Sequence, residues 1–329
     1  MSALIAAARR EGSLNVIALP PGLANYGAVI REFSRRYGIT VHSIAPGDSS
    51  AQEIAQIKSQ NGAAAAPDVL DLSMPVALAH ASLFAPYQVA TWTSIPAGQK
   101  APDGAWVQDY GGYMSVGYDR ARFGVITSLN QLLGPRFRDA VALAGDPRRA
   151  SAALNAVMMA SLASGGSPGD IAPGVSFFHK LKAAGNLVSS PGGGGSFGAP
   201  AAPVVINWDF LNTPALVGRP ATSWKLFIPA QAVVANFSAQ AINARAPHPA
   251  VARLWEEFLY SQGPRGGQNM WARSGLRPVE EAAMAASGTL TRAAVAQLPP
   301  VRGTAVFLSR SDQARAAAYL AAHWAAAVG

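Results

Sequence analysis

The chain has 329 residues, of which 50% are hydrophobic and 13% are charged, and its net charge is +8. This length suits two domains of roughly 150 residues each, and the short basic clusters lack the interleaved aromatic residues typical of nucleic-acid binding, which we therefore do not expect. The absence of cysteine excludes disulfides, thiolate metal ligands and a cysteine nucleophile, and no apolar run approaches the ~20 residues that span a bilayer.

The first twelve residues predict a helix and not a secretion signal. Met1–Gly12 carries its charges after the apolar run, whereas a signal peptide carries them before it. Gly12 is of a type that commonly ends a helix. We expect that an export signal belongs to the protein and is missing from this sequence.

Strand and helix patterns then alternate, which predicts an α/β fold with a mostly parallel sheet. The predicted strands are Leu14–Leu19, Ile39–Ala45 and Asp68–Leu72. Helical patterns lie between them, over Tyr26–Tyr37 and Ser50–Gln60. Because parallel sheets bind ligands beyond the carboxyl ends of their strands, we expect Pro20–Asn25, Pro46–Ser50 and Ser73–Pro75 to surround one crevice.

A second domain is expected in the middle of the chain. Trp106–Tyr118 has no helical period and predicts a long strand that crosses into it, and two extended segments in Trp224–Asn243 return. Lobe 1 is then residues 1–108 and 238–329, and lobe 2 is residues 109–237, with the carboxyl-terminal helices packing on either lobe. Two crossings form a hinge, and hinged α/β lobes can close around a ligand.

Helix boundaries in the second half follow from local signals. Asp146-Pro147 predicts the start of a helix, since Asp is a common N-cap and proline is accepted in the first turn. A terminal helix is expected over Ser311–Ala327. Pro203–Phe210 predicts a strand of the second domain.

That strand ends in Asn207-Trp208-Asp209, the first candidate for contact with a ligand. An indole face attracts an organic cation, and a carboxylate pairs with it. The alternative is structural: Trp208 is a core residue and Asp209 caps the next turn. Both interpretations remain open.

Further candidates come from the first domain and its crossing strand. Ser49 and Ser50 open a helix whose free N–H groups attract anions, or they merely cap that helix. Tyr110 either lines a cleft or packs the hinge. Asp71 is placed to face the crevice.

No reaction centre is evident. Gly194-Gly195-Ser196-Phe197-Gly198 fits the nucleophile elbow of serine hydrolases, but Pro200 and Pro203 oppose the helix that must follow. The five histidines are scattered, so neither a metal site nor a cofactor is expected. A serine hydrolase using Ser196 remains the alternative of another class.

The segment from Ala246 to Gln262 combines a proline-set helix start with an apolar helical face. It resembles the "APHP" segment of periplasmic solute-binding proteins that serve ABC importers of the spermidine/putrescine and ferric-iron type. Segments in the same order as in that family are Leu4–Leu19, Phe33–Val41, Pro67–Leu72, Val175–Leu187, Val204–Asp209 and Gly275–Val279.

The resemblance implies a two-lobed type II periplasmic binding fold that captures a solute in the cleft between its lobes. It implies a permease partner in the inner membrane, a periplasmic location and no catalysis. A monomer is expected. The ligand-binding residues are then Asn25, Ser49, Ser50, Ser73, Tyr110, Ser196, Asn207, Trp208 and Asp209.

The resemblance implies the fold but leaves the class of ligand open. An organic amine of the polyamine kind is our first hypothesis, because Trp208 and Asp209 match polyamine binders in kind. A phosphonate or small carboxylate held by Ser49 and Ser50 is the close alternative. Iron is disfavoured, since the adjacent tyrosines of ferric binders are missing near Asn207. A scaffold or sensor partner without a working cleft is a further class.

Overall fold

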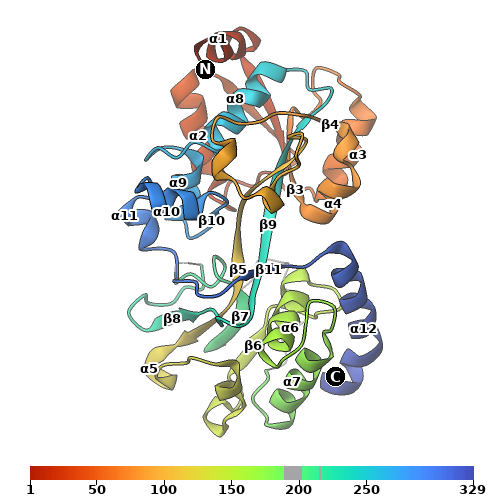
Figure 1. Cartoon of the computed structure of the whole chain (residues 1–329), viewed down its shortest axis with the longest axis vertical. Helices are drawn as coiled ribbons and strands as arrows, with labels where there is room; N and C mark the ends of the chain where they lie inside the picture. Colours follow the sequence, from red (N-terminus) through yellow and green to blue (C-terminus); the bar gives the residue numbers. More distant parts are fainter. Residues whose placement is uncertain (189–201, 215) are drawn as a thin grey trace. The chain divides into compact units, whose positions relative to one another are not determined.

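The computed structural model describes residues 1–188, 202–214 and 216–329 (Figure 1). These residues form two compact units: unit 1 comprises Met1–Gly111 and Phe237–Leu298, and unit 2 comprises Gly112–Asn236 and Pro299–Gly329. Two strands, β5 (Val107–Asp119) and β9 (Val233–Asn243), continue from one unit into the other. The long strand predicted from Trp106 is therefore confirmed as β5.

Unit 1 is built on the parallel strands that the sequence predicted. Strand β1 (Ser13–Ile17) pairs in parallel with β2 (Thr40–Ile44) and with β3 (Val69–Ser73). Strand β9 runs antiparallel to β3, with Asp71 opposite Gln240. Two short strands extend this sheet: β4 (Phe84–Ala85) on β9 and β10 (Arg277–Pro278) on β5.

Helices and short 3-10 turns connect the strands of unit 1 (Figure 1). They are α1 (Ser2–Glu11), α2 (Tyr26–Tyr37), α3 (Ser50–Gln60), α4 (Met74–Ala79), η1 (Ala81–Leu83), η2 (Trp92–Ser94), η3 (Ala97–Gln99), α8 (Pro249–Leu259), α9 (Gly267–Arg273), α10 (Glu281–Ser287) and α11 (Arg292–Val295). Gly12 ends α1 in a left-handed conformation with φ of 78°, as its residue type predicted.

Helix α8 buries the apolar face that its sequence pattern predicted. Val251, Leu254, Phe258 and Leu259 are fully buried, and Trp255 meets Phe33 of α2 edge-on at 5.0 Å between ring centroids. Such aromatic contacts stabilise helix packing by more than the buried apolar area alone provides. The amphipathic pattern thus fixes the face by which α8 attaches to unit 1.

The strands of unit 2 are arranged around β7 (Val204–Trp208) and belong to the same mixed sheet as those of unit 1. Strand β7 is antiparallel to β5 and parallel to β6 (Val141–Leu143). Strand β8 (Trp224–Phe227) pairs antiparallel with β5, and β11 (Ala305–Phe307) pairs parallel with β9. The helical elements are α5 (Arg120–Phe123), η4 (Leu129–Leu133), η5 (Pro135–Phe137), α6 (Ser151–Ala163), α7 (Ala172–Ala183) and α12 (Arg310–Val328).

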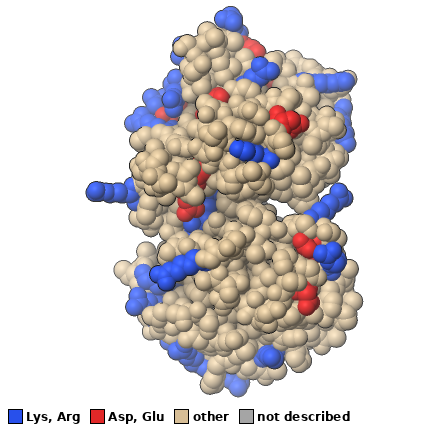
Figure 2. All heavy atoms as spheres, in the orientation of Figure 1, with Lys and Arg blue, Asp and Glu red and all other residues tan. Residues whose placement is uncertain are grey.

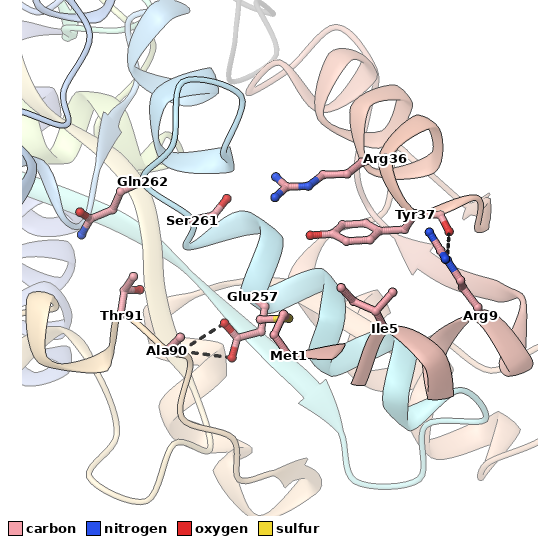
Figure 3. A pocket seen from close by; sticks show the side chains of 10 residues that line it. All are labelled: Met1, Ile5, Arg9, Arg36, Tyr37, Ala90, Thr91, Glu257, Ser261 and Gln262. Atoms are coloured by element: carbon pink, nitrogen blue, oxygen red, sulfur yellow. Dashed lines mark hydrogen bonds between the residues drawn. The ribbon is translucent and has the colours of Figure 1, made fainter. Parts of the chain in front are cut away.

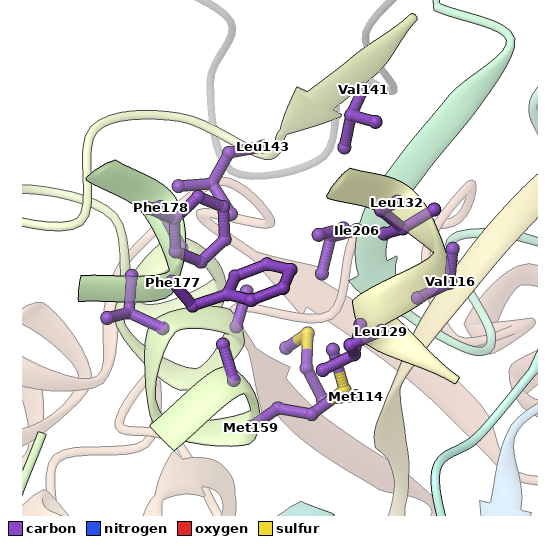
Figure 4. Packing of buried hydrophobic residues seen from close by; sticks show 14 of the residues in the cluster. Met114, Val116, Leu129, Leu132, Val141, Leu143, Met159, Phe177, Phe178 and Ile206 are labelled. Atoms are coloured by element: carbon purple, nitrogen blue, oxygen red, sulfur yellow. The ribbon is translucent and has the colours of Figure 1, made fainter. Parts of the chain in front are cut away.

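The core of unit 2 lies between its sheet and helices α6 and α7 (Figure 4). Phe177 and Phe178 of α7 pack with Ile206 of β7 and Met159 of α6. Trp324 of α12 reaches Phe178 at 5.6 Å between ring centroids. The carboxyl-terminal helix therefore belongs to unit 2, an assignment that sequence reasoning left open between the two lobes.

One local prediction was wrong. The helix expected to start at Asp146-Pro147 begins at Ser151. The Asp146 carboxylate instead accepts the Arg148 N–H at 2.9 Å and pairs with the Arg148 guanidinium, while the Arg149 N–H donates to the Asp146 carbonyl. These bonds close a turn before the helix, because Asp side chains bond nearby backbone groups in turns as readily as at caps.

In the part of the chain that the structure describes, we find no helix of the length and apolarity that crossing a membrane requires.

Candidate functional site

Three helices of unit 1 start at the carboxyl ends of its parallel strands. Asn25, Ser49 and Ser73 are the N-cap residues of α2, α3 and α4, which follow β1, β2 and β3 in turn. Because these strands are parallel, the three caps lie at one edge of the sheet. We call this the carboxyl edge of unit 1.

The structure joins two of the predicted serines directly. The Ser73 N–H donates to Ser50 Oγ at 2.9 Å, which ties the start of α4 to the start of α3. Ser49 forms a capping box with Gln52, whose Oε1 accepts the Ser49 N–H at 2.9 Å. The capping interpretation is thus confirmed for Ser49, whereas Ser50 is the first residue of α3. Ser49 and Ser73 are exposed to solvent.

Asn25 has a different local role. It adopts a left-handed conformation with φ of 59°, and its Nδ2 donates to the Met270 carbonyl at 3.1 Å. Asn tolerates this conformation better than most residues do. The side chain therefore fastens the start of α2 to α9, and among the described residues no hydrogen bond links it to the three serines.

Tyr110 belongs to a hydrogen-bonded cluster that sequence reasoning found only in part. Its hydroxyl donates to Asp71 Oδ2 at 2.8 Å, and the Tyr26 hydroxyl donates to the same oxygen at 2.7 Å. Gln240 Nε2 donates to the Tyr26 hydroxyl and to Asp109 Oδ2, at 3.1 and 2.8 Å. The Trp271 ring packs on Tyr110 at 5.0 Å.

This cluster concentrates carboxyl groups away from water. Burial raises the pKa of Asp71 to about 6. Burial, and then the neighbouring Asp71, raise the pKa of Asp109 well above its ordinary value. Glu53 Oε2 accepts the Asp71 N–H at 3.1 Å, and burial followed by the charge of Asp71 raises the pKa of Glu53 as well. Ionised, these groups repel one another.

The described residues leave two oxygens of these carboxyl groups without a hydrogen-bond donor. Asp71 Oδ1 and Glu53 Oε1 are shielded from water and accept no hydrogen bond. The bonds that reach Asp71, Asp109 and Glu53 come from phenols, an amide, a hydroxyl and backbone N–H groups, and none comes from a Lys or Arg of the described residues. A buried oxygen without a donor is costly, so such a site favours a bound donor or cation.

The unit 2 candidates are held by contacts within that unit. Trp208 is 6% exposed and belongs to the hydrophobic core of unit 2. Asp209 is fully buried, and its Oδ1 accepts the N–H groups of Tyr113 and Phe210, each at 3.0 Å. Asn207 Oδ1 accepts the Trp208 N–H at 2.9 Å. These contacts agree with the structural interpretation, in which Trp208 is a core residue and Asp209 caps the next turn.

Gly112 makes room for this arrangement, since a Cβ there would lie 2.2 Å from Asp209 Oδ1. The approach of the Asp209 carboxylate to the neighbouring strand β5 thus requires glycine. Ser196, the remaining candidate, lies outside the described residues.

A second chain of polar groups in unit 1 has the order Ser–His–Asp. Ser13 Oγ lies 3.2 Å from His248 Nε2, and His248 Nδ1 lies 2.9 Å from Asp68 Oδ2. The fully buried Asp68 also accepts the N–H groups of Asn15 and His248, each at 2.7 Å. Sequence reasoning missed this chain because its members are up to 235 positions apart.

We interpret this chain as structural. Ser13 begins β1 and Asp68 directly precedes β3, so the chain lies at the amino end of the parallel strands, opposite the carboxyl edge. Ligands of α/β sheets bind at the carboxyl ends. The Asn15 amide donates to the carbonyls of Ala64 and Ala66, so this side chain has no N–H left for an oxyanion.

A shallow depression of about 460 Å³ lies elsewhere on unit 1 (Figure 3). Arg36 and Tyr37 face it from α2, and Glu257 faces it from α8, where its carboxylate accepts the Ala90 N–H. It contains no residue of the carboxyl edge. We assign it no role.

Comparison with known proteins yields one family. A sequence profile described as "Bacterial extracellular solute-binding protein" matches residues 77–326. A search of curated protein sequences found no match.

Solved structures share the fold over nearly the whole chain. A Bordetella parapertussis structure described as that of an extracellular solute-binding protein is 13% identical with a TM-score of 0.74, covering 97% of this chain and 99% of its own. AfuA from Actinobacillus pleuropneumoniae with bound fructose-6-phosphate is 14% identical, with a TM-score of 0.62 and coverages of 96% and 98%. Trichodesmium IdiA (FutA) with iron and citrate is 17% identical, with a TM-score of 0.65 and coverages of 95% and 100%.

Proposed function

Because this chain belongs to the bacterial extracellular solute-binding proteins, we propose that it is the substrate-binding component of an ABC importer. In this role the two units are lobes that close on one small polar solute, with β5 and β9 as the hinge. The protein delivers that solute to a permease in the inner membrane. Because the family binds solutes and does not transform them, the serine-hydrolase alternative with Ser196 is abandoned.

The carboxyl edge of unit 1 carries the proposal. It brings three helix starts to the end of a parallel sheet where α/β proteins bind their ligands. Asp71, which belongs to the hydrogen-bonded cluster with Tyr26 and Tyr110, lies two residues before Ser73 on β3.

An organic amine is the solute class that we favour. The support is Asp71 Oδ1, a buried carboxylate oxygen without a donor, in a cluster that receives no Lys or Arg hydrogen bond. An ammonium group supplies N–H donors and the opposite charge at once. Tyr26, Tyr110 and Trp271 add aromatic rings, which attract organic cations.

An anionic solute is the second candidate. Its support is the pair of helix starts at Ser49 and Ser73, which are exposed and close together through Ser50. Helix starts attract phosphate and carboxylate groups. AfuA is described with fructose-6-phosphate bound and the Trichodesmium protein with iron and citrate, so anions accompany this fold in two of its neighbours.

Titration calorimetry distinguishes the two classes. The titrants are putrescine, spermidine, fructose-6-phosphate, aminoethylphosphonate and small dicarboxylates. We expect heat of binding from the amines alone, and loss of that binding in Asp71→Asn. Ser49→Ala is the matched control, because it changes the carboxyl edge without changing the carboxyl cluster. Binding of phosphate or dicarboxylate compounds alone would overturn the amine assignment, and no binding of any class would overturn the transport role.

A further inference from the structure

The positive charge of this protein is concentrated in one of its two units. Unit 2 holds thirteen of the 26 Lys and Arg residues but only six of the 18 Asp and Glu residues, whereas unit 1 is nearly balanced. Seven of the eight net positive charges therefore belong to unit 2. Such a field attracts anionic partners over distances of about 10 Å at 0.1 M salt.

Part of this charge forms a single exposed surface, which we call the basic end. Its members are Arg120, Arg122, Arg136, Arg138, Lys180 and Lys182. They lie on α5, on η5 and the residue that follows it, and on the last turn of α7, which lie at the same end of unit 2 (Figure 1). Lys and Arg side chains gather at that end on the face drawn in Figure 2.

Packing beneath the basic end holds its cations in place. The Phe123 and Phe137 rings stack at 4.8 Å, which joins α5 to η5. The Arg122 and Arg136 guanidinium groups each lie 4.9 Å from the centre of one of these rings. The two stacked rings therefore restrict the positions of these guanidinium groups, because a cation is attracted to the face of an aromatic ring.

A backbone bond attaches the third element. The Asp139 N–H donates to the Gly185 carbonyl at 2.9 Å, and a Cβ at Gly185 would lie 3.6 Å from the Arg138 guanidinium. This contact brings η5 to the end of α7, which carries Lys180 and Lys182. Three separate segments of the chain therefore contribute to one surface.

The basic end is not neutralised by the protein itself. Among the described residues, none of its six cations forms an ion pair, whereas Arg148 and Arg315 elsewhere in unit 2 pair with Asp146 and Asp312. The nearby Asp119 carboxylate accepts the Ala121 N–H and caps α5. The six charges are available to an external anion.

An exposed apolar residue adjoins these cations. Val125 is 53% exposed and follows Phe123 by two residues, in the loop between α5 and η4. Cations around an exposed apolar side chain suit the boundary between water and lipid, where headgroups pair with the cations and the apolar group enters the acyl region. A purely polar anion would make no apolar contact with Val125.

We propose that the basic end binds the surface of a bilayer rich in anionic phospholipid. Arg122, Arg136 and Arg138 pair with phosphate groups, and Val125 inserts among the lipids. The interaction keeps the protein close to the membrane, independently of solute. It does not use any residue of the proposed solute site.

Cosedimentation with vesicles tests the proposal on the full chain. We compare phosphatidylcholine vesicles with vesicles that also contain phosphatidylglycerol, at low and at physiological salt. We expect binding to the anionic vesicles only, weakened by salt. Arg122→Gln/Arg136→Gln/Arg138→Gln is expected to reduce the affinity at least about tenfold. Equal affinity of this variant and the wild type would overturn the proposal.

Two further variants make the result specific. Arg10→Gln/Arg31→Gln/Lys58→Gln removes the same charge from unit 1 and is expected to retain vesicle binding. Val125→Ser is expected to weaken vesicle binding but to leave retention on a heparin column unchanged. If Val125→Ser changes neither, and single-stranded DNA binds through the same arginines, the surface recognises anionic polymers and the lipid proposal is wrong. Circular dichroism confirms the fold of each variant.

Discussion

Individual buried carboxyl groups set much of the pH behaviour expected of this protein. Glu256 of α8 is the clearest case, because its Oε2 is buried without a hydrogen-bond partner and burial, with some effect of Glu257, raises its pKa to about 8. An unfolded Glu titrates near 4.5. The folded state therefore holds a proton that the unfolded state releases, and stability falls as the pH rises from 4.5 to 8.

Replacing Glu256 by Gln removes the ionisable group, and with it the loss of stability at neutral pH. At pH 7 we expect Glu256→Gln to raise the free energy of unfolding by up to about 3 kcal/mol, and the gain should vanish near pH 4. Urea denaturation at the two pH values measures it. Glu257→Gln is the control, because its oxygens already accept bonds from the Tyr87 hydroxyl and the Ala90 N–H, and should give no gain. Equal effects of both variants would contradict the assignment.

Asp71 gives a prediction about the solute. With its pKa at about 6, its carboxyl group is largely ionised at pH 7 and largely protonated at pH 5. The affinity for an amine should therefore fall by roughly tenfold between these pH values, because the proton competes with the ammonium group. Calorimetry with putrescine at both pH values checks this. An affinity that is flat or rises toward pH 5 would place the amine elsewhere.

At the scale of elements, one buried side chain links two strands to a distant helix. Asp68 accepts hydrogen bonds from Asn15 of β1 and from the backbone and ring of His248, the residue before α8. Removing one acceptor thus leaves several buried donors unpaired, and each costs about 1–3 kcal/mol.

Asp68→Ala should consequently destabilise the protein by about 2–4 kcal/mol. Ser13→Ala, which removes only the outer hydroxyl of the chain, should cost less than about 1 kcal/mol. Urea denaturation of both variants measures the difference. A loss in Ser13→Ala as large as that in Asp68→Ala would show that the hydroxyl, and not the carboxylate, sustains the link.

Elements were predictable from the sequence where their signal is local. The apolar face of α8 and the strand β5 follow from the spacing of apolar residues. The end of α1 at Gly12 follows from the residue type, because glycine commonly ends helices. The cluster of Tyr26, Asp71 and Gln240 was not predictable, because pairing of β3 with β9 brings together residues that are far apart in sequence. The helix start predicted at Asp146 was wrong because an Asp carboxylate can accept a backbone N–H in a turn as well as at a helix N-cap.

At the scale of the whole molecule, the proposed function requires the two units to move. Small-angle X-ray scattering should record a smaller radius of gyration when the solute identified by calorimetry is present at saturation, since closure of hinged lobes compacts the molecule. Asp71→Asn at the same solute concentration should show no change. A wild type whose scattering does not respond to a bound solute would exclude lobe closure.

The interleaved course of the chain has a consequence for biosynthesis. Unit 1 needs Phe237–Leu298, which leaves the ribosome after most of unit 2, and unit 2 needs Pro299–Gly329, which leaves after all of unit 1. Domains made of one continuous segment can fold while the ribosome is still translating. Here unit 1 cannot be completed until most of unit 2 has been made, and unit 2 cannot be completed until all of unit 1 has been made, so cutting the gene at a single point cannot yield an intact half.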